Sequence, residues 1–384
     1  MKDAGIYIHI PFCRSRCSYC DFATGMYQPA LAERYVHSVV KEISNWQEVN
    51  TNGPLDTIFF GGGTPSLLSP TQVDSILRAV RSRFELIAGA EITLEINPGD
   101  CGTTPTDRLE TLSELRRLGI NRASFGAQTF DDHELRHLGR THTSADIQRT
   151  FRELREVGFD NINFDLIAGL PGQRLGTWSR NLDQALALRP EHLSLYLLEV
   201  HEGTPLADQI RRGQRPKPDD DLAAEMYQVM IERLCAAGYE HYEISNFCRP
   251  GFAARHNTKY WTGLPYYGFG CSAHSYDGEF RRWANERDVT RYADAIDCGD
   301  SVVVERTVLS ESEVRAESVF LGMRMMRGIN VQSYQARFGA DPREVYRDDL
   351  ARFREAGLVE FDGELIRLTR DGALLSNEVF AAFV

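Results

Sequence analysis

Short apolar runs alternate with longer amphipathic stretches over residues 1–240 of this 384-residue chain. Such alternation is typical of β/α units, in which each strand of a parallel sheet is followed by a helix. The pattern predicts strands at residues 5–10, 56–60, 91–96, 122–126, 161–167 and 193–198. It predicts helices at residues 70–84, 106–118, 144–157, 177–188 and 219–237. Ser69 is the expected N-cap of the first of these helices, because Pro70 suits the first helical position.

Six strands are fewer than the eight of a closed β/α barrel, so the pattern predicts an α/β fold, an open and partial (β/α)6 barrel. In β/α barrels the C-terminal ends of the strands and the loops after them carry function. The unusual residues of this chain fall at such ends. Three cysteines follow the first strand and three glycines follow the second, while Glu95, Gln128 and Asp165 lie at the ends of the third, fourth and fifth strands.

Residues 310–384 have a different pattern: three predicted helices, a hairpin and a last helix. The hairpin is predicted at residues 358–368, because Asp362-Gly363 between two apolar runs is a strong turn signal. We therefore expect three domains: a barrel core at residues 1–240, an extension of the barrel at 241–309, and a small α+β domain like a winged helix at 310–384. The last segment has 13 acidic and 10 basic residues, which favours packing or a lid over DNA binding.

The composition is that of a soluble globular protein, with 42% hydrophobic and 26% charged residues. A net charge of −12 disfavours a nucleic-acid partner, which usually needs a basic surface. The sequence contains no apolar run near the ~20 residues that span a bilayer, and its start does not resemble a secretory signal. We expect a cytoplasmic protein.

Cys13, Cys17 and Cys20 form a Cys-x-x-x-Cys-x-x-Cys run directly after the first predicted strand. Three thiolates on one tight loop suit a cubane iron–sulfur cluster and leave one iron without a protein ligand. A structural zinc site normally needs a fourth ligand, and no such ligand follows. A disulfide is disfavoured because cytosolic thiols stay reduced. The remaining cysteines have no ligand spacing, so all are expected to be small buried residues: Cys101, Cys235, Cys248, Cys271 and Cys298.

The cysteine spacing resembles that of radical S-adenosylmethionine (SAM) proteins, in which SAM chelates the fourth iron of a [4Fe–4S] cluster. Two further segments, Tyr-Ile-His-Ile-Pro-Phe-Cys at residues 7–13 and Phe-Gly-Gly-Gly-Thr-Pro-Ser at 60–66, are similar to the branch that contains oxygen-independent coproporphyrinogen III oxidases and related haem chaperones. The resemblance extends through most of the chain. It implies a partial radical SAM barrel, a cluster on Cys13, Cys17 and Cys20, bound SAM, and an electron donor for the cluster.

Several residues match positions that contact SAM in this family. The glycine loop lacks the Gly-Lys-Ser/Thr ending of a phosphate-binding loop, and Glu95 is acidic within an apolar strand, where a carboxylate needs a partner. The resemblance implies that SAM contacts Tyr7, Gly62, Gly63, Thr64, Glu95, Gln128, Arg140 and Asp165. It places Tyr19 near the adenine. The alternative for each residue alone is a salt bridge, a cap or a polar pair in the core.

Two features separate the oxidases from the haem chaperones. The oxidase pattern continues to a fourth cysteine, where this chain has Phe22. The chain also contains His-Asn-Thr-Lys-Tyr-Trp at residues 256–261, which resembles the His-Asn-x-x-Tyr-Trp signature of the chaperones. Imidazole is a common axial ligand of haem, and Tyr and Trp offer flat faces to a macrocycle. His256, Tyr260 and Trp261 are the candidate haem residues, with His274 a spare ligand. The alternative is a structural loop that covers the barrel opening.

We therefore expect a haem chaperone that binds haem, a [4Fe–4S] cluster and SAM and delivers haem to acceptor proteins, with membrane-bound respiratory proteins among the candidate acceptors. The first alternative is an enzyme that oxidatively decarboxylates coproporphyrinogen III. A radical SAM methyltransferase or a redox-sensing regulator is the more remote alternative, because no further cysteine is placed for methyl transfer.

Overall fold

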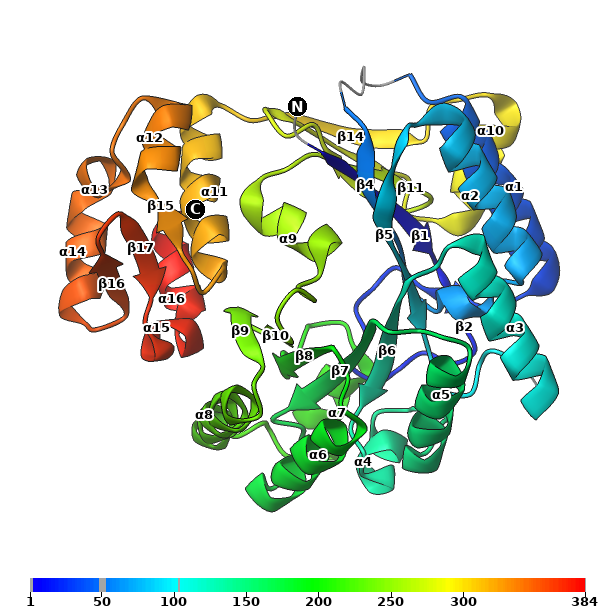
Figure 1. The fold of residues 1–384 in the computed structure, drawn as a ribbon, viewed down its shortest axis with the longest axis horizontal. Helices are drawn as coiled ribbons and strands as arrows, with labels where there is room; N and C mark the ends of the chain where they lie inside the picture. Colours follow the sequence, from blue (N-terminus) through cyan, green and yellow to red (C-terminus); the bar gives the residue numbers. More distant parts are fainter. Residues whose placement is uncertain (1–2, 48–52, 103, 384) are drawn as a thin grey trace.

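The computed structural model describes residues 3–47, 53–102 and 104–383. Six parallel strands form the centre of one large sheet, in spatial order as in sequence (Figure 1). They are β1 (Ala4–Ile10), β4 (Leu55–Gly62), β5 (Leu86–Ile96), β6 (Arg122–Gln128), β7 (Ile162–Ala168) and β8 (His192–Leu197). All six predicted strands are present, and the predicted partial barrel is confirmed.

Helices cover the outer face of this sheet (Figure 1). They are α1 (Pro29–Ser44), α2 (Pro70–Arg83), α3 (Pro105–Leu118), α5 (Ser144–Glu156), α6 (Leu175–Leu188) and α8 (Asp220–Ala236). The start of α2 is as predicted, since Ser69 accepts a hydrogen bond from the Gln72 amide and Pro70 opens the helix. The strands beneath these helices are largely buried; β4, for example, is buried at every position but the last.

Both edges of the parallel sheet carry extensions that periodicity did not predict. Beside β1, β11 (Tyr266–Phe269) continues the parallel order and leads into antiparallel β12 (His274–Tyr276), β13 (Arg281–Asn285) and β14 (Val303–Val308). Beside β8 lie antiparallel β10 (Asn246–Cys248) and β9 (Glu240–Glu243). Strands of three to six residues give too few positions for a clear alternation, which explains why they were missed.

Residues 311–383 form a separate lobe beside the barrel (Figure 1). Its helices are α11 (Glu311–Arg324), α12 (Val331–Phe338), α13 (Pro342–Val345), α14 (Arg347–Glu355), α15 (Arg370–Leu374) and α16 (Ser376–Phe380). Its sheet has the order β15 (Ile329–Asn330), β17 (Leu365–Leu368), β16 (Val359–Asp362). The predicted hairpin is confirmed. The predicted last helix is instead two short ones, because Leu375 has non-helical φ and ψ angles of −100° and 27°.

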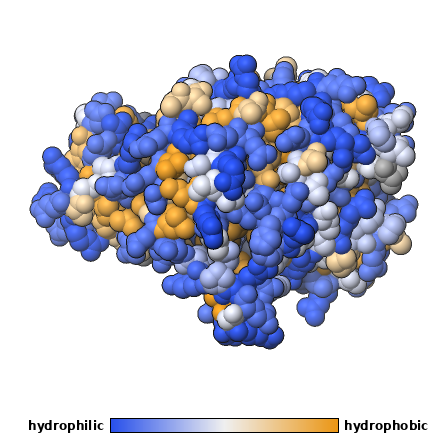
Figure 2. Space-filling model, turned by 90° about the horizontal axis from the view of Figure 1, so that it is seen from below, coloured by the Kyte–Doolittle hydropathy of each residue, from blue (hydrophilic) through white to orange (hydrophobic). Residues whose placement is uncertain are grey.

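The lobe has its own hydrophobic cluster but is fastened to the edge of the barrel. The amide of Ile244 donates to the carbonyl of Arg324 at 3.1 Å, and the amide of Met326 donates to the carbonyl of Tyr242 at 3.0 Å. The Arg324 guanidinium also pairs with the fully buried Glu243 at 2.8 Å. Apolar surface gathers where the lobe, on the left, meets the body of the molecule (Figure 2).

The prediction that all five scattered cysteines are buried was only partly right. Cys101, Cys248 and Cys271 are buried, whereas Cys235 and Cys298 are exposed. Both exposed cysteines belong to the last turns of surface helices, where one helical position decides between the inner and the outer face. None of the helices in the described ranges combines the length and the apolar character needed to cross a bilayer.

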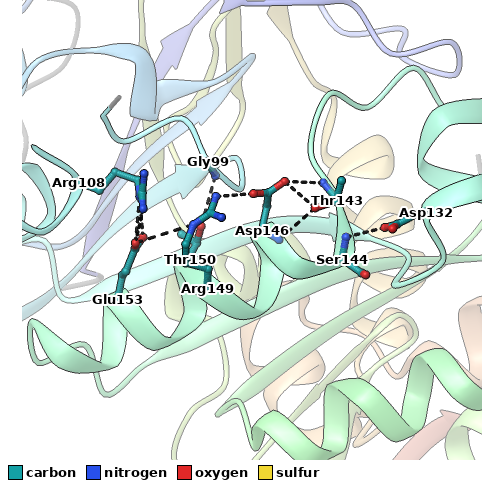
Figure 3. A network of polar contacts seen from close by, with 9 residues as sticks. All are labelled: Gly99, Arg108, Asp132, Thr143, Ser144, Asp146, Arg149, Thr150 and Glu153. Carbon is teal, nitrogen blue, oxygen red and sulfur yellow. Dashed lines mark hydrogen bonds and ion pairs between the residues drawn. The ribbon is translucent and has the colours of Figure 1, made fainter. Parts of the chain in front are cut away.

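A polar network along α5 braces the loop that follows β5 (Figure 3). Arg108 of α3 pairs with Glu153 of α5 at 2.8 Å, and both side chains are only 10% exposed. One turn away, the Thr150 hydroxyl accepts a hydrogen bond from the Gly99 amide at 3.3 Å. This contact matters for the site, because Gly99 lies three residues after Ile96, the last residue of β5.

Replacing Arg108 with Ala should lower the free energy of unfolding by about 3 kcal/mol, because Glu153 would keep its buried charge without its main partner. Urea denaturation monitored by circular dichroism measures the change. Arg352→Ala is the matched control, since its pair with Asp349 is exposed and should matter by less than about 0.5 kcal/mol. The double change Arg108→Leu with Glu153→Leu should recover most of the loss. A single variant as stable as the wild type would contradict this role.

Candidate cofactor site at the mouth of the barrel

A cavity of about 530 Å³ lies at the C-terminal ends of the parallel strands. Its lining includes all three candidate cluster ligands, Cys13, Cys17 and Cys20. It also includes seven of the eight residues expected at SAM: Gly62, Gly63, Thr64, Glu95, Gln128, Arg140 and Asp165. On the far side, residues of α15 and α16 complete the wall, so the C-terminal lobe covers part of the mouth. The tertiary structure thus gathers predicted site residues that are up to 152 positions apart in the sequence, from Cys13 to Asp165.

The cysteine loop leaves the end of β1 and is held at both sides by backbone hydrogen bonds. The Ser18 amide donates to the Leu138 carbonyl at 3.0 Å, and the Leu206 amide donates to the Ser18 carbonyl at 2.8 Å. The thiols of Cys13, Cys17 and Cys20 are all free and partly exposed. Burial raises the pKa of the Cys13 thiol to about 11, so that loading with iron must displace a proton there.

These thiols fit a cluster better than a single ion. Within the described residues, no three His, Cys, Asp or Glu side chains are placed to hold one metal ion. In a cubane cluster each thiolate binds a different iron, so the three sulfurs need not converge on one point. Three protein thiols would leave the fourth iron of such a cluster open to another ligand.

The glycine loop after β4 lies directly against the cysteine loop. A Cβ atom on Gly63 would lie 2.7 Å from the Phe12 carbonyl oxygen and 3.0 Å from the Cys13 sulfur, so that no side chain fits there. Gly62 has a φ of +113°, which favours glycine. Its amide donates to the Glu95 carboxylate at 3.1 Å. The loop is therefore more than a turn, since its backbone packs against the expected ligands of the cluster.

A chain of polar contacts runs from the cysteines to Arg140. The Thr64 hydroxyl lies 3.7 Å from the Cys13 sulfur and accepts a hydrogen bond from the Asn97 amide group at 2.8 Å. Arg140 donates to the Asn97 side-chain oxygen at 2.9 Å and to the Tyr19 hydroxyl at 2.7 Å. Sequence reasoning missed Asn97. Its position directly after Glu95-Ile96, at the same strand end, was the signal that could have found it.

Buried charges line the floor of the cavity. Burial, reinforced by the nearby Asp165, raises the pKa of the Glu95 carboxyl to about 8. Burial also raises the pKa of Asp165, although Asn163 donates to its carboxylate at 2.7 Å. Arg122 is buried beneath these carboxyls and was also missed by sequence reasoning.

Two buried donors in this floor have no protein acceptor. They are the Nε groups of Arg122 and Arg140, which find no hydrogen-bond partner within the described structure. Carboxyl groups beside unsatisfied guanidinium donors fit an amino acid ligand with a cationic and an anionic group, as SAM has. The residues present therefore fit SAM.

Gln128 and Tyr7 occupy different positions relative to the cavity. Gln128 lines it and has a φ of +66°, a left-handed conformation that is costly for a residue with a side chain and often marks a functional site. Tyr7 is absent from the lining. Its hydroxyl is 3.1 Å from Nδ1 of His9, and its ring stacks on Phe59 and His256. Its contact with SAM stays a prediction.

The predicted haem residues lie on α9 (Arg255–Thr262), and none of the three lines this cavity. His256 is 1% exposed. Its Nδ1 is 2.9 Å from the Thr57 hydroxyl, and its Nε2 is 2.9 Å from the Tyr260 hydroxyl. Burial lowers the pKa of His256 to about 3, so the ring is neutral. Both ring nitrogens are engaged, so axial ligation of haem by His256 stays a prediction that would require one contact to break.

The comparisons with known proteins agree with this architecture. Residues 7–184 match the model of the radical SAM superfamily, and residues 309–375 match the HemN C-terminal domain. The solved structure of coproporphyrinogen III oxidase (HemN) from Escherichia coli superposes with a TM-score of 0.85 at 24% identity, covering 100% of this chain and 90% of that one. That likeness confirms the fold. The barrel and its cysteines define the class: this is a radical SAM protein.

Full-length relatives narrow the class further. Heme chaperone HemW from Bacillus subtilis is 36% identical and covers 100% of this chain and 99% of its own length. HemW from Lactococcus lactis is 34% identical over 100% and 98% of the two chains. A mitochondrial radical S-adenosyl methionine domain-containing protein 1 from Bos taurus is 34% identical over 99% and 87%. Within the radical SAM class, the chain belongs to the HemW family.

Asn97 and Arg140 should support SAM without holding the cluster. Asn97→Ala and Arg140→Ala should each weaken SAM binding about tenfold or more, since each removes charge-assisted or buried hydrogen bonds at the cavity wall. Both variants should keep the iron content and the visible absorption of the reconstituted cluster. Cys17→Ala should lose both, while Cys298→Ala, an exposed thiol far from the cavity, should lose neither. Equilibrium dialysis of SAM and iron analysis measure the two properties. Unchanged SAM affinity in both first variants would refute the assignment.

Glu95 should make the stability of the cofactor-free protein depend on pH. Its folded pKa of about 8 lies above the usual 4.5, so between these values the folded state keeps a proton that the unfolded state has released. Stability attributable to Glu95 should therefore fall as the pH rises from 5 to 8, by no more than about 1.4 kcal/mol per pH unit.

Glu95→Gln cannot ionise and should lose this slope, while its side-chain oxygen can still accept from the Gly62 amide. Urea denaturation of both proteins across this range gives the difference. Glu42, whose pKa burial raises to about 7, contributes equally to both proteins and cancels. Parallel stability curves for wild type and variant would contradict the raised pKa.

Proposed function

We propose that this protein is a haem chaperone that binds a [4Fe–4S] cluster, SAM and haem, and that passes haem to acceptor proteins. The observation that carries the proposal is the similarity over the whole chain to relatives named heme chaperone HemW, at 34–36% identity. The similarity includes the barrel, the segment with the His-Asn-x-x-Tyr-Trp signature and the C-terminal lobe. The division into domains at residues 1–240, 241–309 and 310–384 belongs to the proposal.

In this proposal the residues of the cavity bind the cluster and SAM. Cys13, Cys17 and Cys20 would hold the cluster, and the glycine loop leaves room beside them. Glu95 and the backbone of Gly62 would orient the SAM ammonium group, and Arg140 its carboxylate or hydroxyls. When bound, the cluster supplies one electron for cleavage of the SAM sulfonium, and the covered mouth limits access of water. Asp165 would bind the ribose hydroxyls.

Haem would be bound by α9 through Tyr260 and Trp261, with His256 beside them. An external electron donor would reach the cysteine loop, whose three thiols are partly exposed. The acceptors would be apoproteins that need haem, including membrane-bound respiratory ones. Delivery requires that haem be held reversibly. Stacking of the macrocycle on aromatic rings and hydrogen bonds to its carboxylates are contacts that can be released.

Coproporphyrinogen III oxidase is the second candidate function, because the same barrel carries that activity in the E. coli structure. Phe22 argues against it. This residue stands where the oxidase pattern has a fourth cysteine; it lines the cavity and is 63% exposed. A large apolar side chain at the mouth also changes what can enter. We therefore propose binding of haem without conversion of coproporphyrinogen.

Titration of haem into the purified protein should give a saturable Soret band at about one haem per chain. With SAM and a reductant, the same preparation should release no carbon dioxide from coproporphyrinogen III. A reference oxidase in parallel shows that the assay detects decarboxylation. Phe22→Cys should not create the activity, because substrate recognition involves other residues. Conversion of coproporphyrinogen by the unmodified protein would move it to the oxidases, and failure to bind haem would remove the chaperone function.

A further inference from the structure

A second cavity, of about 790 Å³, lies between the barrel extension and the C-terminal lobe. We call it the interlobe cleft. One wall is made by α9 and strands β11, β12 and β13, and the other by α11, β15 and α12. Its volume falls in the range of sites that take ligands of drug or cofactor size. It is distinct from the cluster cavity and shares no lining residue with it.

Aromatic rings from both lobes line the interlobe cleft. The barrel side contributes Tyr260, Trp261, Tyr266 and Tyr276, and the lobe contributes Tyr334 and Phe338. On the barrel side, Tyr260 and Tyr266 meet edge to face with 4.6 Å between ring centroids, and on the lobe side Tyr334 and Phe338 lie 4.7 Å apart. Rings on two facing walls suit a flat, largely apolar ligand.

The cleft is basic although the protein is acidic. Three arginines and one glutamate line it, a net charge of +2 in a chain of −12. Arg282 is neutralised, because it makes a two-pronged pair with Glu317 at 2.8 and 2.7 Å. Arg337 donates a long hydrogen bond of 3.5 Å to the Gly278 carbonyl, hydrogen-bonds the Tyr276 side chain and lies over the Phe338 ring at 4.9 Å, but it has no ion pair among the described residues. Arg327 is exposed and has no ion pair within the described part of the chain. Two guanidinium groups of the cleft therefore have no carboxylate partner among the described residues.

We propose that the interlobe cleft is the haem site, with the two propionates on Arg327 and Arg337 and the macrocycle between the aromatic walls. The proposal rests on the proposed function and locates it. Haem is flat and apolar with two carboxylates at one edge, which matches both the rings and the two arginines that have no ion pair in the described structure. Guanidinium groups bind carboxylates with strong, paired hydrogen bonds.

The position of α9 explains the His-Asn-x-x-Tyr-Trp signature at residues 256–261 in physical terms. Asn257 lines the cluster cavity, whereas Tyr260 and Trp261 line the interlobe cleft. His256 belongs to neither lining, and its Nε2 contacts the Tyr260 hydroxyl from behind. Arg324 lies over the Trp261 ring at 4.2 Å. In this arrangement His256 and Arg324 are positioning residues that fix the two rings, and α9 is the wall between the two cofactor sites.

The test is haem binding by the whole protein. Quenching of tryptophan fluorescence and the Soret band measure the binding. Arg327→Glu and Arg337→Glu should each weaken haemin binding about tenfold or more, and the double variant further. Arg327→Lys and Arg337→Lys should keep much of the affinity. Arg347→Glu, an exposed arginine of the same lobe outside the cleft, is the matched control and should bind as the wild type. Circular dichroism and urea midpoints show whether each variant folds.

Haemin dimethyl ester, which lacks the carboxylates, should bind wild type and glutamate variants equally. His256→Gln should leave the Soret maximum in place, because a positioning residue does not ligate iron, whereas loss of an axial ligand would shift it. Equal haemin affinity in wild type and in the folded double variant, with haem still bound, would place the site elsewhere and leave the chaperone function standing. Absence of haem binding by the wild type would instead overturn the proposed function itself.

Discussion

The candidate site depends on the close contact between the cysteine loop after β1 and the glycine loop after β4. Strands β1 and β4 pair in register up to Ile10 and Gly62, and the Gly63 amide then donates to the Ile10 carbonyl at 2.8 Å. The two loops therefore leave the sheet at the same level. Only glycine fits at position 63, since any Cβ would strike the Phe12 carbonyl and the Cys13 sulfur. This packing brings the thiols beside the ends of the next strands.

The polar floor of the barrel follows from that arrangement. Parallel strands end at one edge, so single polar residues at the ends of β5, β6 and β7 meet in one cavity although they are distant in sequence. Burying Glu95 and Asp165 together keeps their pKa values high, and the nearby Arg122 and Arg140 oppose that effect. A cavity with protonatable carboxyls and guanidinium donors lacking acceptors is organised for a ligand.

The C-terminal lobe adds a wall to each of the two cavities. Its last helices line the mouth of the barrel, and α11 and α12 face the aromatic side of α9. The Arg324 side chain joins these roles, because it pairs with buried Glu243 at the barrel edge and covers the Trp261 ring. The lobe thus covers part of both cavities, and the helix α9 contributes residues to the lining of each.

The sequence alone determined the six parallel strands, the cysteine loop, the glycine loop and the hairpin of the last lobe, because long apolar runs, turn residues and ligand spacing are local signals. It also suggested Glu95 and Arg140. Only the tertiary structure revealed the short edge strands, Asn97 and Arg122 in the cavity, and the burial of His256 between two hydrogen bonds. Tertiary structure also decided that Tyr260 and Trp261 face a basic cleft, since that depends on how α11 and α12 pack against α9, which no local pattern encodes.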